Sequence, residues 1–409
     1  MNYLLLSTND SGGAGLAVLK TIESLRAKGH NAKLIVLNKY SSSEASIGLY
    51  NYNSFFGKVQ IWYHRILAKI YKKITVGTPV DRFCFNNVNL NRISATQILK
   101  LYGEKPDIIS VAWVSDFVDF KTVYELKQIT GARVMYIMAD NSPITGGCHY
   151  PWECVGYQQN CFPCPALNNN NRKAYKTLSH KKQYVTDDMM ISGTTNDVNR
   201  ALKSAVFRNC TIVPSVTIRP NPYCFTREEG LEKWGINKDN YVILCGAASL
   251  NVERKGFSEL IKAMSVIKEK GIDISKITII VAGGSCAPFP EGYDVKCVGS
   301  LSFEDLFRAY GCADLFVCPS LEDSGPMMIN YGIMQYIPVV AFEMGVALDL
   351  IVHKENGYIA KWRDVNDFAN GILYCMNRRF KKEDLKTFND RLAEVLTNER
   401  SLFKYLGID

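Results

Sequence analysis

Short apolar runs alternate with amphipathic stretches along most of the chain. In the first part, an apolar run at residues 3–7 is followed by a polar, glycine-rich turn at 9–13, a stretch of helical periodicity at 14–28 that Gly29 closes, and a second apolar run at 32–37. Runs of this length predict buried strands, and apolar spacings of three and four predict helices. The order strand, helix, strand implies a parallel sheet. Further strands are expected at 107–112 and 133–139.

The same alternation restarts after the proline-rich stretch at residues 218–222, which is the expected linker because proline suits neither a central helix nor a central strand. Strands are predicted at 241–246, 276–282, 294–298, 314–319 and 338–342, with helices between them and further helices at 366–376, 382–397 and 401–406. The predicted fold class is therefore α/β, with two doubly wound, Rossmann-like domains facing each other across a cleft. We expect domains at 1–217 and 218–390, and a helical segment at 391–409 that packs back toward the first domain.

The size and composition agree with two globular domains. A chain of 409 residues exceeds the length at which single cores stop growing, and 47% apolar with 22% charged residues is ordinary for a globular protein. The net charge of +8 is modest and no nucleic-acid module is legible, so a nucleic-acid partner is not expected. Without a recognisable signal sequence or a membrane-spanning run, a cytoplasmic location is expected.

One segment, residues 55–74, is basic, aromatic and amphipathic. No acidic residue occurs between Glu44 and Asp81, while five lysine or arginine side chains are interleaved with aromatic and aliphatic ones. Such a segment suits the anionic inner face of a plasma membrane, to which the protein would then bind peripherally. The ordinary alternative is a surface helix whose apolar stripe docks on its own domain.

Two loops that follow predicted strands have the composition of phosphate-binding sites. The first, residues 9–14, carries Gly12 and Gly13 at the start of a helix, where free amides and the helix dipole favour phosphate oxygens. It lacks the complete dinucleotide fingerprint and the Walker lysine, so a tight turn without a ligand is the alternative. The second places Arg254 and Lys255 at a helix start, where two cations favour an anion such as a diphosphate. An exposed basic pair in solvent is the alternative there.

A third loop, residues 319–326, follows the strand predicted at 314–319. Glu322 is suited to accept hydrogen bonds from sugar hydroxyls. The next helix is expected to begin after this residue, and the free backbone amides at its start favour phosphate. The residues there are Ser324, Gly325, Pro326 and Met327, of which proline has no amide hydrogen. Simple capping of that helix is the alternative.

Taken together, these loops resemble the retaining glycosyltransferases of family four, which have the GT-B fold. The resemblance spans the chain through the motifs DSGGAG at 10–15, TGGCHY at 145–150, NP at 221–222, RKGF at 254–257, VAGG at 281–284, VGSL at 298–301, PSLEDSGP at 319–326 and PVVAF at 338–342. Within that family the chain resembles a bacterial polysaccharide-type group that has TGGCHY and a cysteine-rich loop. It implies transfer of a hexose-type sugar from a UDP or GDP sugar, with retention of configuration, to a glycan or lipid-linked glycan acceptor in cell-surface polysaccharide synthesis.

The resemblance also assigns roles to residues. Gly12, Gly13, Arg254 and Lys255 would bind the donor diphosphate, Glu322 would contact the transferred sugar, and Leu301 would line the base pocket. Asn330 stands where the family has a second glutamate, a ligand of the ribose. Asp140 remains on the acceptor side, although Ala139 replaces a histidine that such relatives usually carry.

This reaction needs no protein nucleophile and no catalytic cofactor or metal. The donor's leaving phosphate can take the proton of the incoming hydroxyl, while Arg254, Lys255 and helix-end amides neutralise its charge. Two alternatives stay open: a nucleotide-sugar epimerase of the same architecture, and an inactive protein that binds nucleotide sugars or acts as a scaffold. A dehydrogenase is disfavoured by the incomplete fingerprint.

Four cysteines gather in the irregular segment 140–165. Cys148, Cys154, Cys161 and Cys164 lie with His149 beside the first of them. Four thiols in a loop with little regular structure favour a structural Zn²⁺ site, whereas two disulfides or four unligated thiols are the alternatives. Elsewhere, Cys245 and Cys318 lie in apolar strands and are expected to be reduced core thiols.

Overall fold

The computed structural model describes residues 1–86, 92–168, 171–215, 223–284, 286, 288–399, 405 and 407. Within them the chain forms two compact units. The N-terminal unit contains the described residues of 1–193 and 197–215 together with 405 and 407, and the C-terminal unit contains 194–196 and the described residues from 223 to 399. The expected linker at 218–222, which includes Asn221 and Pro222, lies outside the described residues. So does nearly all of the helix expected at 401–406.

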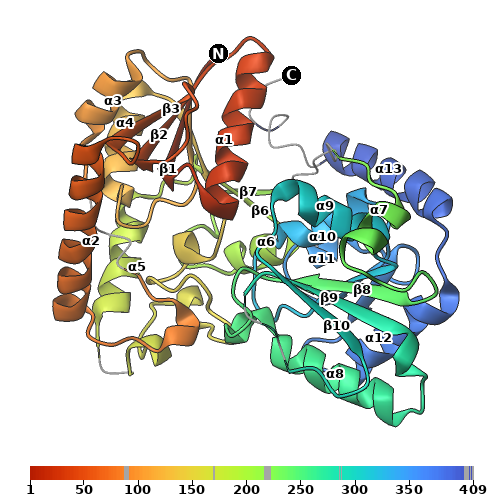
Figure 1. Cartoon of the computed structure of the whole chain (residues 1–409). Helices are drawn as coiled ribbons and strands as arrows, with labels where there is room; N and C mark the ends of the chain where they lie inside the picture. Colours follow the sequence, from red (N-terminus) through yellow and green to blue (C-terminus); the bar gives the residue numbers. More distant parts are fainter. Residues whose placement is uncertain are drawn as a thin grey trace. The chain divides into compact units, whose positions relative to one another are not determined.

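The N-terminal unit is built on a seven-stranded parallel sheet with the strand order β3-β2-β1-β4-β5-β6-β7. Its strands are β1 (Asn2–Asn9), β2 (Asn31–Lys39), β3 (Ser46–Asn51), β4 (Ile108–Val111), β5 (Arg133–Ile137), β6 (Met190–Gly193) and β7 (Thr211–Pro214). Its helices are α1 (Gly12–Ala27), α2 (Phe55–Thr75), α3 (Ala95–Tyr102), α4 (Phe120–Thr130), α5 (Lys173–Tyr184) and α6 (Thr195–Ala201). Figure 1 shows α1 on one side of β1 and β2, with α3 and α4 on the other.

The position of β1 inside this sheet explains why its sequence does not alternate between apolar and polar residues. Tyr3 and the three leucines that follow it in β1 are all fully buried, as expected of a parallel strand covered on both faces. Each fully buried leucine stabilises the fold by roughly 1.5–3 kcal/mol. The Tyr3 hydroxyl is satisfied by a hydrogen bond with Ser110 Oγ on the neighbouring strand β4 (2.5 Å).

The C-terminal unit has a six-stranded parallel sheet with the order β10-β9-β8-β11-β12-β13. Its strands are β8 (Tyr241–Gly246), β9 (Ile277–Ala282), β10 (Asp294–Gly299), β11 (Leu315–Cys318), β12 (Val339–Phe342) and β13 (Gly357–Ala360). Its helices are α7 (Arg227–Lys233), α8 (Phe257–Glu269), α9 (Phe303–Cys312), α10 (Met327–Met334), α11 (Ala347–Leu350), α12 (Val365–Arg378) and α13 (Lys382–Glu399). The prediction of two doubly wound α/β units is confirmed.

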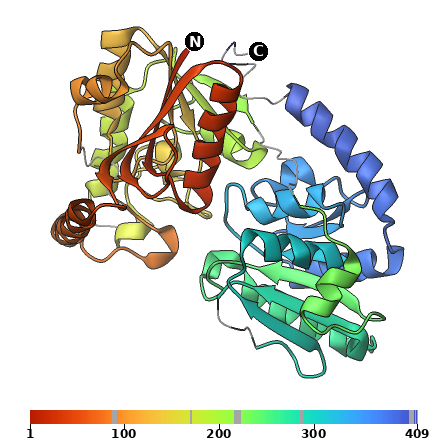
Figure 2. The same ribbon diagram turned by 45° about the horizontal axis from the view of Figure 1, so that its top comes forward.

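The segment at residues 55–74 is a helix, α2, but its apolar stripe does not dock on the N-terminal unit. Only Gly57 and Ile61 are buried, while Phe55, Phe56, Trp62 and most other apolar side chains of the helix are exposed. The alternative that this helix docks its apolar stripe on its own domain is therefore wrong. Figures 1 and 2 both place α2 at the outer edge of this unit, away from α1. No helix in the described parts of the chain is long and apolar enough to cross a membrane.

Two pairs of cysteines outside the irregular segment bear on the sequence analysis. Cys245 and Cys318 are free and buried, as expected of core thiols. Cys286 and Cys297 are joined by a disulfide, which the sequence analysis did not predict.

Candidate functional site

The second and third loops meet in the C-terminal unit. They follow β8 and β11, which pair in parallel with Leu315 opposite Ile243, so their carboxyl ends lie side by side at one edge of the sheet. The backbone N–H of Leu321 donates to the carbonyl oxygen of Arg254 (2.8 Å) and ties the two loops together.

Gly256 allows this close approach. Its φ of +65° lies in the left-handed region, and a Cβ atom at this position would come within 1.8 Å of the carbonyl oxygen of Pro319. Only glycine fits both conditions, which explains the glycine directly after Arg254 and Lys255.

The two cations of the second loop share one carboxylate from the third. Arg254 Nη1 lies 2.8 Å from Asp323 Oδ2, and Lys255 Nζ lies 2.5 Å from the same oxygen. All three side chains are about four-fifths buried, at 21%, 20% and 15% exposed. The basic pair is therefore not in open solvent, and the chain itself supplies one anion for it. A donor diphosphate would have to bind beside Asp323 or displace it.

The other candidate residues of the C-terminal unit lie in the third loop, in α10 and after β10. Glu322 and Ser324 are buried in the same loop, Gly325 is exposed, and Pro326 precedes α10, which begins at Met327. Asn330 is buried one turn into α10. Leu301, after β10, is partly buried and packs against the core of the unit.

Besides the ion pairs of Asp323, a further contact of this site was not predicted from the sequence. Trp362 Nε1 donates to the carbonyl oxygen of Leu321 (2.9 Å) and so links the residues after β13 to the third loop. Trp362 follows β13, a four-residue strand that starts with glycine and shows no long apolar run. Its only sequence signal is a lone tryptophan in a polar stretch.

In the N-terminal unit, Gly12 and Gly13 begin α1 and are both exposed. Gly12 has a φ of +73°, and no atom stands within 4 Å of a Cβ built on either glycine. The described residues therefore leave the space beside both glycines open, as the close approach of an anion would require.

Asp10 anchors the same loop. Its carboxylate accepts hydrogen bonds from the Tyr40 N–H (2.7 Å), the Ser41 hydroxyl (2.6 Å) and the Ser46 hydroxyl (2.8 Å). Burial alone would raise the pKa of Asp10, but these hydrogen bonds outweigh it and hold the pKa below its ordinary value.

Asp140 and His149 form a buried pair beyond β5. His149 Nδ1 is hydrogen-bonded to Asp140 Oδ2, and Ser115 Oγ lies 3.5 Å from His149 Nε2. Burial alone would raise the pKa of Asp140. The charge and hydrogen bond of His149, together with hydrogen bonds from Ser142, outweigh this effect, so the pKa of Asp140 lies below its ordinary value. This arrangement keeps the carboxylate ionised and fixes the orientation of the imidazole.

The four cysteines of the irregular segment come together around one small cavity of about 20 Å³, and none of them is in a disulfide. We call Cys148, Cys154, Cys161 and Cys164 the four-thiol cluster. A hydrogen bond between Cys148 and Cys164 is the main cause that raises the pKa of Cys148 and lowers that of Cys164 to about 7.

Backbone N–H groups also donate to the sulfurs of this cluster, from Gly156 to Cys154 and from Ala166 and Leu167 to Cys164. Within the described parts of the chain, however, no three His, Cys, Asp or Glu side chains are arranged to hold a metal ion as they stand. The zinc site stays a prediction.

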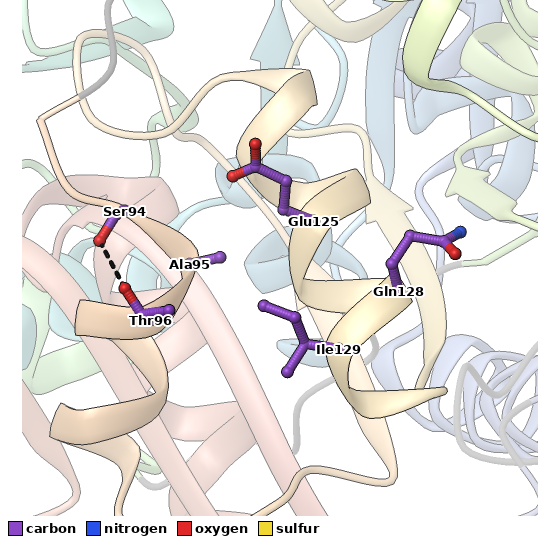
Figure 3. A pocket seen from close by; sticks show the side chains of 6 residues that line it. All are labelled: Ser94, Ala95, Thr96, Glu125, Gln128 and Ile129. Carbon is purple, nitrogen blue, oxygen red and sulfur yellow. Dashed lines mark hydrogen bonds between the residues drawn. The ribbon is translucent and has the colours of Figure 1, made fainter.

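A shallow hollow of about 330 Å³ lies elsewhere on the N-terminal unit (Figure 3). Figure 3 shows it between the start of α3, at Ser94, and the side chains of Glu125 and Gln128 on α4. It contains none of the predicted site residues.

Comparison with known proteins supports the fold. Residues 240–378 match the family model described as "Glycosyl transferases group 1", and no curated protein matches the chain. A sucrose-phosphate synthase from Thermosynechococcus elongatus is 14% identical over 98% of this chain and 95% of its own, with a TM-score of 0.61. A glycosyltransferase from Rickettsia africae is 16% identical over 100% and 97%, with a TM-score of 0.56.

A third similar structure is Anabaena Alr3699/HepE in complex with UDP-glucose, 13% identical over 98% of this chain and 95% of its own, with a TM-score of 0.55. At these identities the likeness establishes the fold alone. The predicted GT-B fold is confirmed, and the family match over the C-terminal unit supports a glycosyltransferase of this type.

Proposed function

We propose that the protein transfers a sugar, of hexosyl type, from a UDP or GDP sugar to a glycan or lipid-linked glycan, in the synthesis of a cell-surface polysaccharide. The observation that carries the proposal is the grouping of Arg254, Lys255, Glu322 and Asp323 at the carboxyl ends of the adjacent strands β8 and β11. Ligands of open parallel sheets bind at this edge. The UDP-glucose bound to the similar Anabaena protein agrees with a nucleotide-sugar donor.

In the proposed reaction the bond between the anomeric carbon and the donor diphosphate breaks, and a bond from that carbon to the acceptor oxygen forms on the same face. The acceptor's hydroxyl proton passes to the leaving phosphate. Arg254 and Lys255 stabilise the negative charge that develops on the diphosphate, and no metal ion is needed for this. Asp323 holds both cationic heads in place before the donor arrives, which limits the reorganisation needed during the reaction.

The first test is calorimetric titration of the protein with UDP, GDP and ADP. We expect one of the three to bind, and the double variant Arg254→Ala/Lys255→Ala to bind it at least 100-fold more weakly, because each charge-assisted hydrogen bond contributes about 1.5–3 kcal/mol. Lys262→Ala is the matched control, since Lys262 is an exposed cation on α8 outside the site. If none of the nucleotides binds, the transferase proposal fails.

The sugar end is tested separately with the intact donor. Glu322→Ala is expected to leave binding of the free nucleotide nearly unchanged while lowering the transfer rate, because Glu322 is assigned to the sugar. Product formed from the donor without an acceptor would instead indicate an epimerase. Donor binding with no turnover in the presence of a broad acceptor set would indicate a scaffold, the role that Asn330 in place of a glutamate would fit.

A further inference from the structure

Helix α2 is attached to the N-terminal unit by one narrow face. Ser54 caps its start by accepting a hydrogen bond from the Gly57 N–H (3.0 Å), and Gly57 packs so tightly that a Cβ there would lie 1.8 Å from the carbonyl oxygen of Asn51. Further along the same face, Ile61 is buried, and His64 stacks on Tyr50 and is hydrogen-bonded to its hydroxyl (2.7 Å). These contacts fix the rotation of the helix about its axis.

With this rotation fixed, the large apolar side chains of α2 point away from the unit. Phe56, Trp62 and Ile74 are 80%, 64% and 78% exposed. They recur at helical spacing and form one continuous face, which we call the α2 apolar face: Phe55, Phe56, Val59, Trp62, Tyr63, Leu67, Ile70, Tyr71 and Ile74. Contiguous exposed apolar patches of this kind mark interaction sites.

The cations of α2 flank this apolar face. Lys58, Arg65, Lys69, Lys72 and Lys73 occupy the helix, and no carboxylate occurs between Glu44 and Asp81. None of the five lies within 4 Å of a described carboxylate, although the charge of Lys72 helps to lower the pKa of Asp116, which burial raises. An exposed aromatic face beside a band of cations is the pattern of a helix that lies in a membrane interface, with aromatic rings at headgroup depth and lysines near the phosphates.

We propose that α2 binds the surface of a lipid bilayer that carries anionic headgroups, with the α2 apolar face inserted at the boundary between headgroups and acyl chains. The five cations of α2 favour an anionic bilayer over other partners for this face. A second copy of the chain would bring two sets of five cations together, which is electrostatically unfavourable, whereas anionic headgroups complement them. The proposal rests on α2 alone and does not require sugar transfer, although a lipid-linked acceptor would lie at the same surface.

The test is co-sedimentation of the full chain with vesicles of phosphatidylcholine alone or mixed with phosphatidylglycerol. We expect binding only to the mixed vesicles, and weaker binding as salt is added. Phe56→Ser/Trp62→Ser/Ile70→Ser should reduce it at least tenfold, because apolar area is lost. Lys58→Gln/Lys69→Gln/Lys73→Gln should reduce it on the order of 100-fold, because each cation near an anionic surface adds to the affinity.

A matched control and a second measurement make the result decisive. Ile129→Ser/Leu202→Ser removes exposed apolar side chains of the same unit outside α2 and should leave vesicle binding unchanged. Failure of the protein to bind the mixed vesicles, or binding that survives both triple variants, would overturn the proposal. So would a dimer in light scattering that the apolar variant abolishes, since a second copy would then cover the face. Nucleotide titration of the same variants reports on the proposed function alone. Nucleotide binding without vesicle binding would therefore contradict only the membrane proposal.

Discussion

His149 and Asp140 stand nine positions apart in the sequence, yet their side chains meet as a buried hydrogen-bonded pair beyond the end of β5. The neighbouring position 139 holds alanine where relatives of the resembled family usually carry a histidine. His149 nevertheless places an imidazole against the adjacent carboxylate. The TGGCHY stretch and Asp140 therefore act as one structural unit in this chain.

This pair gives the first prediction. Asp140→Asn removes the charge that the imidazole faces and should lower the free energy of unfolding by about 1–3 kcal/mol, because a buried hydrogen bond to a charged group is weakened. Urea denaturation at neutral pH measures it. Glu125→Gln, which removes only an exposed partner of Lys121, should change stability by less than about 0.5 kcal/mol. Equal effects of the two variants would contradict a special role for the buried pair.

The second prediction concerns the junction of the two loops in the C-terminal unit. Gly256→Ala should push the Arg254 loop away from Pro319, because its Cβ has no room there, and should weaken nucleotide binding at least tenfold. Gly271→Ala is the control: its φ of +74° is equally left-handed, but no atom lies within 4 Å of its Cβ. It should cost about 1 kcal/mol of stability and leave binding unchanged. Both properties are measured by calorimetry and denaturant titration.

Much of this architecture was readable from the sequence, for a physical reason. Strands such as β1 and β8 are buried on both faces, so they are continuous apolar runs, and the polar loops after them are the places where a parallel sheet binds ligands. Strands β3, β6, β7 and β13 were missed. Ser46–Asn51 carries Gly48 and polar ends, and the other three strands have only four residues each, so none of them shows the run that marks a buried strand.

The rest depended on contacts between distant segments. Asp323 was not predicted as the partner of Arg254 and Lys255, because that contact follows from the pairing of β8 with β11 and not from any local pattern. For α2, the periodicity showed an amphipathic helix but not which face docks. Gly57 and His64, neither of them part of the apolar stripe, decide that.

The third prediction is a pH dependence at Asp10. Its pKa is lower in the folded protein than in the unfolded chain, so its ionised form stabilises the fold above about pH 4, and this contribution is lost as pH falls through the folded pKa. Asp10→Asn should therefore be less stable than the unmodified protein at pH 7, by about 1–3 kcal/mol. The difference should shrink as the pH is lowered below about 4. Urea titrations at several pH values measure it, and a difference that does not change with pH would contradict it.

The last prediction concerns the four-thiol cluster. The four thiols line one small cavity and some accept backbone N–H bonds, and four thiolates would close a tetrahedral site around Zn²⁺. We expect protein purified from zinc-supplemented cells to carry about one zinc per chain, and a chelator to lower its thermal stability. Elemental analysis and thermal denaturation measure these. Cys161→Ser/Cys164→Ser should lose the metal, whereas Cys224→Ser, an exposed thiol of the C-terminal unit, should keep it. A protein that contains no zinc and whose four thiols all react with a thiol reagent in the native state would show that the cluster is a set of unligated cysteines.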